Sequence, residues 1–69
     1  MPTQIFKLRI EFITSEEDVD DEVVGFINHQ KGMVEIIEYK DTKDYSIKGF
    51  IPFNSIKKLE IIEEIGMID

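Results

Sequence analysis

The chain has 69 residues, so it holds one small domain over residues 1–69 and leaves no room for a second. Apolar residues make up 42% of it and charged residues 33%, which is typical of a globular protein and excludes a disordered or collagen-like chain. It has no cysteine, no basic leader and no long apolar run, which excludes a disulfide framework and predicts a cytoplasmic protein that does not enter the membrane.

The net charge of -7 is concentrated in one segment of the sequence. Six acids and no base lie within seven residues: Glu16, Glu17, Asp18, Asp20, Asp21 and Glu22. The rest of the chain holds nine acids against eight bases and is therefore close to neutral. The segment is either a solubilising loop or helix start, or an acidic edge that binds a basic surface of a larger protein.

The first predicted element is a strand over residues 5–13. Apolar and charged residues alternate there with the period of two of a half-buried strand: Phe6, Leu8, Ile10 and Phe12 against Lys7, Arg9 and Glu11. We expect this strand at an edge of the sheet, where a long strand with one apolar face needs a partner chain or other protection. This requirement favours a homo-oligomer.

Residues 15–28 support two interpretations. Ser15 followed by acids is a capping box, and the apolar residues from 19 to 27 have helical spacing, which predicts a helix within residues 16–30. Against a helix, Gly25 lies among β-branched and aromatic residues, which favour a strand. Residues 28–32 have the length of a hairpin loop and contain its glycine.

Residues 33–39 and 45–53 are predicted to form a β-hairpin, because both are rich in β-branched and aromatic residues and the polar run 40–44 turns the chain between them. Four residues of the second strand are expected on one apolar face: Tyr45, Ile47, Ile51 and Phe53. Gly49 indicates a bulge or a bend. Phe50 falls on the polar face of this strand, which indicates a partner-binding residue.

The C-terminal segment is predicted to make a tight turn and then a short strand. Pro52, Asn54 and Ser55 favour the turn, and Leu59 with Ile61 can point inward from the strand. A helix over residues 55–65 is the alternative, but it would carry two lysines at its start and two glutamates at its end. Both pairs of charges would oppose the helix dipole.

The strand interpretations together predict a mainly β fold of five strands with a short turn before the last. The alternative is an α+β fold in the order β-α-β-β, followed by a helix or a strand. Residues 49–60, Gly-Phe-Ile-Pro-Phe-Asn-Ser-Ile-Lys-Lys-Leu-Glu, resemble the C-terminal end of a Src-homology-three (SH3) barrel. Ser55 stands where that family has an aromatic residue, so the resemblance implies the small barrel without the groove that binds proline-rich peptides.

Two segments also resemble the signatures of Sm-like proteins, which include the Hfq-type RNA chaperones. Residues 26–34 lie where the first signature would, and residues 47–49, Ile-Lys-Gly, are similar to the Ile-Arg-Gly of the second. Asn28 replaces the expected Asp, and Gly32 replaces the Asn that helps to hold a base. The resemblance implies ring-forming strand pairing between subunits and ligands bound near Asn28 and Lys48.

The sequence contains no catalytic constellation. His29 is the only histidine and there is no cysteine, so the usual pairing of a nucleophile with a base is absent. The alternating acids at positions 18, 20 and 22 lack the glycine and the distal glutamate of a calcium loop. We therefore expect no enzyme, no cofactor and no metal site.

Three non-catalytic functions are compatible with these patterns. The favoured one is an interaction or inhibitor protein whose acidic edge binds a larger protein with a basic surface. The second is a homo-oligomeric barrel that binds a nucleotide or another small ligand between subunits, through Asn28, His29 or Lys48. The third is an RNA-binding Sm-like protein, which the net charge disfavours and which would use a basic face of four residues: Lys7, Arg9, Lys57 and Lys58.

Overall fold

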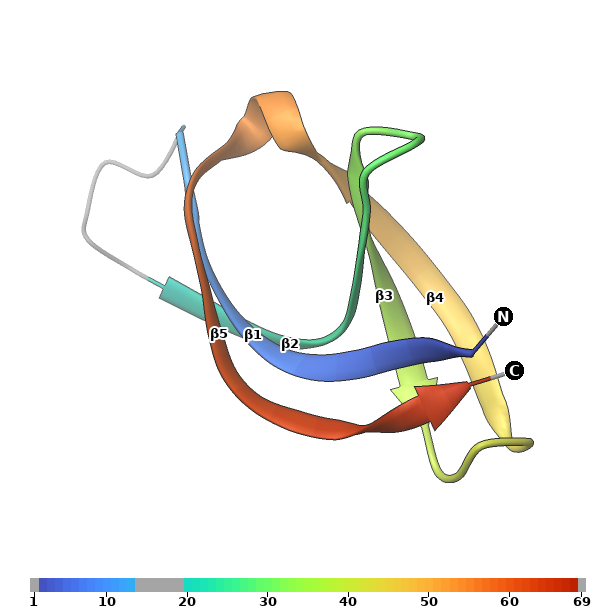
Figure 1. Ribbon diagram of the computed structural model, residues 1–69. Coiled ribbons are helices and arrows are strands. Elements are labelled where there is room, and N and C mark those ends of the chain that lie inside the picture. The colour runs from blue at the N-terminus through green and yellow to red at the C-terminus, as the bar shows by residue number, and fades with distance from the viewer. Residues whose placement is uncertain (1, 14–19, 69) are drawn as a thin grey trace.

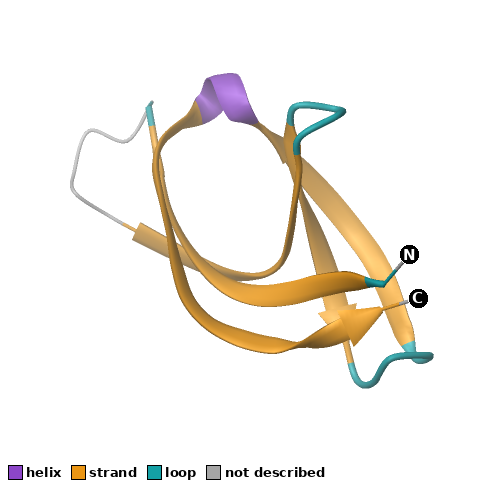
Figure 2. Ribbon diagram, viewed as in Figure 1, coloured by secondary structure: helices purple, strands orange, loops and turns teal. Residues whose placement is uncertain are grey.

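The computed structural model describes residues 2–13 and 20–68 and is mainly β, as predicted (Figures 1 and 2). Its elements are β1 (Thr3–Phe12), β2 (Asp20–Asn28), β3 (Met33–Tyr39), β4 (Tyr45–Pro52), the 3-10 helix η1 (Phe53–Ser55) and β5 (Ile56–Ile68). The η1 turn stands where the short turn before the last strand is predicted. No helix in the described ranges is long and apolar enough to cross a membrane.

The five strands form one antiparallel sheet in the order β4-β3-β2-β1-β5. β1 to β4 follow one another as a meander, and β5 returns to pair with β1 (Figure 1). No ladder joins β4 to β5 among the described strands, so the sheet is not closed into a barrel. The expectation that residues 5–13 form an edge strand is wrong, because β1 has β2 on one side and β5 on the other.

β2 decides between the two interpretations of the segment before the hairpin. Residues 20–28 are a strand, so the helix predicted within residues 16–30 is wrong over these positions. Gly25 explains the outcome, because it pairs with Phe6 of β1 and Ile36 of β3, and a Cβ there would overlap the carbonyl oxygen of Glu35. Pairing on both sides outweighs the local capping signal. Residues 16–19, which would begin the helix, lie outside the described residues.

β5 confirms the predicted strand and excludes the alternative helix over residues 55–65, but with 13 residues it is longer than expected. Its ladder with β1 shifts register three times, and each shift leaves one extra residue on β5: Lys57, Ile62 and Ile65. An extra residue bends a strand and increases its twist. β5 therefore curves together with β1 around one side of the molecule (Figure 1).

The β3–β4 hairpin forms as predicted, with β3 over the expected residues and β4 ending at Pro52. A register shift leaves Lys48 as the extra residue of a bulge, beside the predicted position Gly49. The single apolar face expected for this strand is wrong, because Ile51 is buried while Ile47 and Phe53 are exposed. The bulge at Lys48 changes which side chains of β4 share a face. In addition, β4 lies at an edge of the sheet, where side chains have fewer neighbours.

The sheet buries two clusters of apolar side chains, and the strand registers place them on opposite faces. One cluster contains Leu8, Ile10, Val34 and Ile51, and the other contains Ile5, Ile37 and Ile68. Residues three apart on a regular strand point to opposite faces, which places Ile5 and Leu8 of β1 in different clusters. The curvature of the sheet thus supplies two small cores without a second layer.

Tyr39 holds the end of β5 against β3. Its hydroxyl donates a hydrogen bond to the carbonyl oxygen of Met67 at 3.2 Å, and its ring lies where a Cβ on Gly66 would be. We expect Tyr39→Phe to lower the free energy of unfolding by about 1 kcal/mol. Gly66→Ala should lower it by about 1 kcal/mol as well, because the Tyr39 hydroxyl must move and loses its hydrogen bond. Urea denaturation measures both, and a Gly66→Ala protein as stable as the wild type would contradict this contact.

Candidate interaction surface

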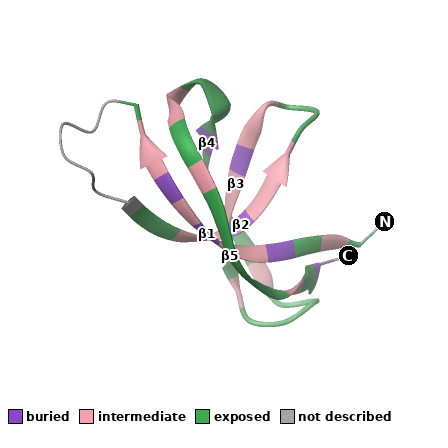
Figure 3. Cartoon of the chain, turned by 60° about the vertical axis from the view of Figure 1, so that its left-hand side comes forward, coloured by how far each residue is buried: buried purple, intermediate pink, exposed green. Residues whose placement is uncertain are grey.

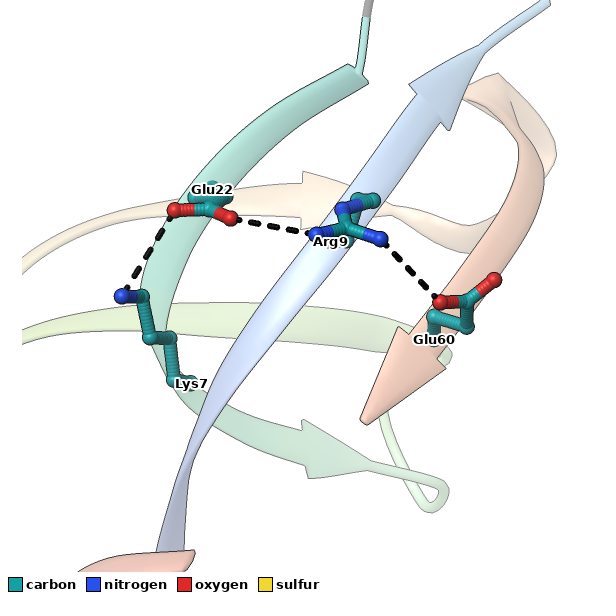
Figure 4. Close-up of polar contacts among 4 residues, drawn as sticks. All are labelled: Lys7, Arg9, Glu22 and Glu60. Carbon is teal, nitrogen blue, oxygen red and sulfur yellow. Dashed lines mark hydrogen bonds and ion pairs between the residues drawn. The ribbon is translucent and has the colours of Figure 1, made fainter. Parts of the chain in front are cut away.

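A ladder of ion pairs crosses one face of β2, β1 and β5 (Figure 4). Arg9 lies opposite Glu22 on β2 and opposite Glu60 on β5, and its guanidinium nitrogens are 3.4 Å from a carboxylate oxygen of each. Lys7 Nζ is 3.6 Å from the second oxygen of Glu22. These side chains are 37% to 50% exposed, so each pair stabilises the fold by about 1 kcal/mol at most. The main effect of these ion pairs is to neutralise the charges of Lys7 and Arg9.

The other bases on strands are also paired with glutamates. The N···O distances are 3.5 Å for Lys57–Glu11, 3.5 Å for Lys58–Glu60 and 3.1 Å for Lys48–Glu38. Every lysine and arginine on a described strand thus has a carboxylate partner. The four bases predicted as a nucleic-acid face do not form an unpaired basic patch, because each of them already contacts a glutamate: Lys7, Arg9, Lys57 and Lys58.

The acidic edge is only partly placed by the structure. Three of its acids lie outside the described residues: Glu16, Glu17 and Asp18. Asp20 begins β2, Asp21 is exposed, and Glu22 is held by Lys7 and Arg9. Asp21 makes no ion pair with any described residue, so its carboxylate is unengaged, in contrast to that of Glu22.

Asn28 and His29, two of the predicted ligand-binding residues, lie at the β2–β3 turn. Asn28 Nδ2 donates to Glu35 Oε2 at 3.0 Å, and Asn28 Oδ1 accepts from the backbone N–H of Lys31 at 3.1 Å. Gly32 completes the turn with a φ of 68°, a conformation that suits glycine. The amide of Asn28 therefore stabilises the turn, and a role of this residue in ligand binding stays a prediction.

Lys48, the third predicted ligand-binding residue, lies apart from the other two. It is the bulge residue in the middle of β4 and pairs with Glu38, whereas Asn28 pairs with Met33 at the far end of β3. The structure does not bring the three together within one chain. In the part of the chain that it describes there is no pocket, and no group of three or more side chains that could hold a metal ion.

β4 presents an apolar surface that the sequence indicates only in part. Phe50 is 63% exposed, more than any other large apolar side chain described, and Ile47 is 58% exposed. Phe50 lies opposite Glu35 and Ile47 lies opposite Ile37, and these two β3 residues share a face because they are two apart. The bulge at Lys48 thus puts Ile47 and Phe50 on the same face, and we call this pair the β4 surface.

Aromatic neighbours extend the region around the β4 surface. Phe53 of η1 is 37% exposed, and its ring meets that of His29 edge to face with centroids 6.0 Å apart. Phe26 of β2 lies on the other side of Glu35 and is half-buried against the second cluster. The single histidine therefore packs as an aromatic side chain at the rim of this region.

Comparison with protein-family models, with curated proteins and with solved structures finds no match. The resemblances to SH3 and Sm-like barrels therefore stay predictions, and the surfaces above rest on the geometry of this chain.

Proposed function

We propose that the chain is a non-catalytic interaction protein that binds a larger protein with a basic surface and inhibits it by covering that surface. The β4 surface carries the proposal, because a bulge aligns two strongly exposed apolar side chains, Ile47 and Phe50. An aromatic anchor of this kind, inserted into a pocket of a partner, is typical of the residues that dominate binding energy. The carboxylate of Glu35, directly opposite Phe50, adds a negative charge beside the anchor.

The charge distribution supports a basic partner. The bases on strands are matched by glutamates, while Asp21, Glu63 and Glu64 are exposed and form no ion pair with described residues. Three turn lysines are also without an ion pair among the described residues, namely Lys31, Lys40 and Lys43, but so are Glu35, Asp41 and Asp44. The uncompensated charge is therefore negative, in line with the net charge of -7. Such a field attracts a basic protein surface, speeds association with it, and repels the phosphates of nucleic acids.

The test begins with capture on the immobilised chain from an extract of the cells that make it, and continues with the purified partner. We expect Phe50→Ser to weaken binding at least about tenfold while leaving the fold intact, because the side chain is exposed in the unbound protein. Ile13→Ser is the matched control, since Ile13 is 56% exposed at the end of β1. Calorimetry on the purified pair measures both affinities.

Salt provides the second arm of this test. Raising NaCl from about 50 mM to about 500 mM should weaken binding, mainly by slowing association, because it screens the acidic residues. A partner whose affinity responds neither to Phe50→Ser nor to salt would contradict the proposal.

A further inference from the structure

β5 is an edge strand, because no other described strand pairs with its outer side. Much of it is exposed (Figure 3), including four large apolar side chains with exposed fractions from 38% to 53%: Ile61, Ile62, Ile65 and Met67. A long apolar edge is a template for pairing with another strand. The opposite edge, β4, ends at Pro52, which has no backbone N–H to donate to another strand.

The charges of β5 are sorted by sign along the strand. Lys57 and Lys58 lie near its start, and Glu63 and Glu64 lie near its end. Two copies of a strand related by a two-fold axis pair antiparallel, so the start of each copy lies beside the end of the other. The lysines of each copy would then face the glutamates of the other, and β5 is complementary in charge to itself.

The ladder with β1 defines the register of this complementarity. Three β5 residues lie opposite every second residue of β1: Lys58 opposite Glu11, Glu60 opposite Arg9 and Glu63 opposite Lys7. In sequence, Lys58 is two residues from Glu60 and Glu63 is three, but the extra residue Ile62 has no partner on β1. Measured by the β1 positions opposite them, Lys58 and Glu63 are therefore equally far from Glu60, and all three side chains lie on the same face of the sheet. A two-fold axis at Glu60 therefore places Lys58 of each copy opposite Glu63 of the other.

The same axis also pairs apolar side chains. Leu59 and Ile61 lie opposite Ile10 and Leu8, one β1 position on either side of Arg9. Each Leu59 would face Ile61 of the second copy, on the other side of the sheet from the charged pairs. The two copies of Glu60 meet at the axis, and each already has a nitrogen of Arg9 at 3.4 Å and Lys58 Nζ at 3.5 Å. These cations offset the repulsion between the two carboxylates.

We propose that β5 pairs antiparallel with β5 of a second copy of this chain, about a two-fold axis at Glu60, so that two five-stranded sheets become continuous. We infer a second copy of this chain as the partner of β5, because a single register pairs the lysines of one copy with the glutamates of the other. The same register also pairs the apolar residues of the two copies. The inference is independent of the proposed function, because the β4 surface lies at the other edge of the sheet and stays exposed in such a dimer.

Charge reversal tests the dimer. Lys58→Glu places two glutamates opposite each other at both symmetric positions, and Glu63→Lys places two lysines there. We expect the wild-type chain to sediment as a dimer, and each variant to dissociate at roughly a hundredfold higher concentration. An equimolar mixture of the two variants should form a heterodimer, because both charged contacts are then restored. Sedimentation equilibrium and native mass spectrometry of the full chain measure these states.

Two controls separate the dimer contact from folding. Circular dichroism checks that each variant is folded, and the double variant with both charges exchanged should dimerise like the wild type. Lys43→Glu is the matched control, because Lys43 is an exposed lysine of the β3–β4 turn and is not part of β5. The proposal is overturned by a wild-type monomer at about 100 µM, well above the dissociation constants of specific complexes. It is equally overturned by variants that dimerise unchanged, or by a mixture that does not associate.

Discussion

Gly25→Ala is expected to lower the free energy of unfolding by about 3 kcal/mol, a large share of the stability of so short a chain. The added Cβ would overlap the carbonyl oxygen of Glu35 and press on the Cα of Ile36, and both belong to the backbone of β3. The backbone cannot swing aside like a side chain, so the β2–β3 ladder must open. Overpacking costs about 1–3 kcal/mol and occasionally more, and this contact belongs at the upper end. A domain of this size is stable by only about 3–10 kcal/mol.

Gly49→Ala is the matched control, because Gly49 also lies within a strand but a Cβ there would meet no atom within 4 Å. It should change the free energy of unfolding by about 0.5 kcal/mol at most, or raise it slightly by restricting the unfolded chain. Circular dichroism and urea denaturation compare the two proteins. Equal stability of Gly25→Ala and Gly49→Ala would show that β2 and β3 do not approach each other at Gly25 as described.

The strands that sequence analysis locates best are those with a strong local pattern. The alternation around Leu8 and the β-branched run of β3 each indicate a strand without reference to any neighbour. β2 differs because a capping signal before it competes with its β-branched residues. Only contact between Gly25 and residues of β1 and β3 decides the outcome, and that contact joins distant parts of the sequence.

β5 shows why the length and exposure of a strand escape sequence analysis. The spacing of Ile62 and Ile65 also suits a helix, and nothing local marks them as the extra residues of bulges. The bulges exist because a long strand must follow the curved β1. The pattern predicts that Ile61 points into the core, yet it is 53% exposed, because no described strand pairs with the outer side of β5.

The sequence predicts which residue types belong to the candidate interaction surface, but it does not predict which of them lie next to one another. The exposure of Phe50 follows from its place among polar residues, whereas Ile47 joins it only because the bulge falls at Lys48. The acidic segment is plain in the sequence, but the engagement of Glu22 depends on its register opposite Arg9. Register across strands is set by long-range pairing, and a single sequence does not reveal it.

Leu8→Ala and Ile37→Ala should each lower the free energy of unfolding by about 2–5 kcal/mol. Leu8 is fully buried in one cluster and Ile37 is 3% exposed in the other, on the opposite face of the sheet. If both faces are packed, the two substitutions have similar effects, because each leaves a cavity in a small core. Either effect is a large share of the stability of so short a chain.

Ile47→Ala provides the control for the second cluster, because Ile47 lies directly opposite Ile37 on the same face but is 58% exposed. Its truncation should lower the free energy of unfolding by less than about 1 kcal/mol, since the side chain gives up little buried surface. Urea denaturation of the three variants compares the sites under the same conditions. If Ile37→Ala were as mild as Ile47→Ala, the second face would not be packed, and the fold would depend on the cluster around Leu8 alone.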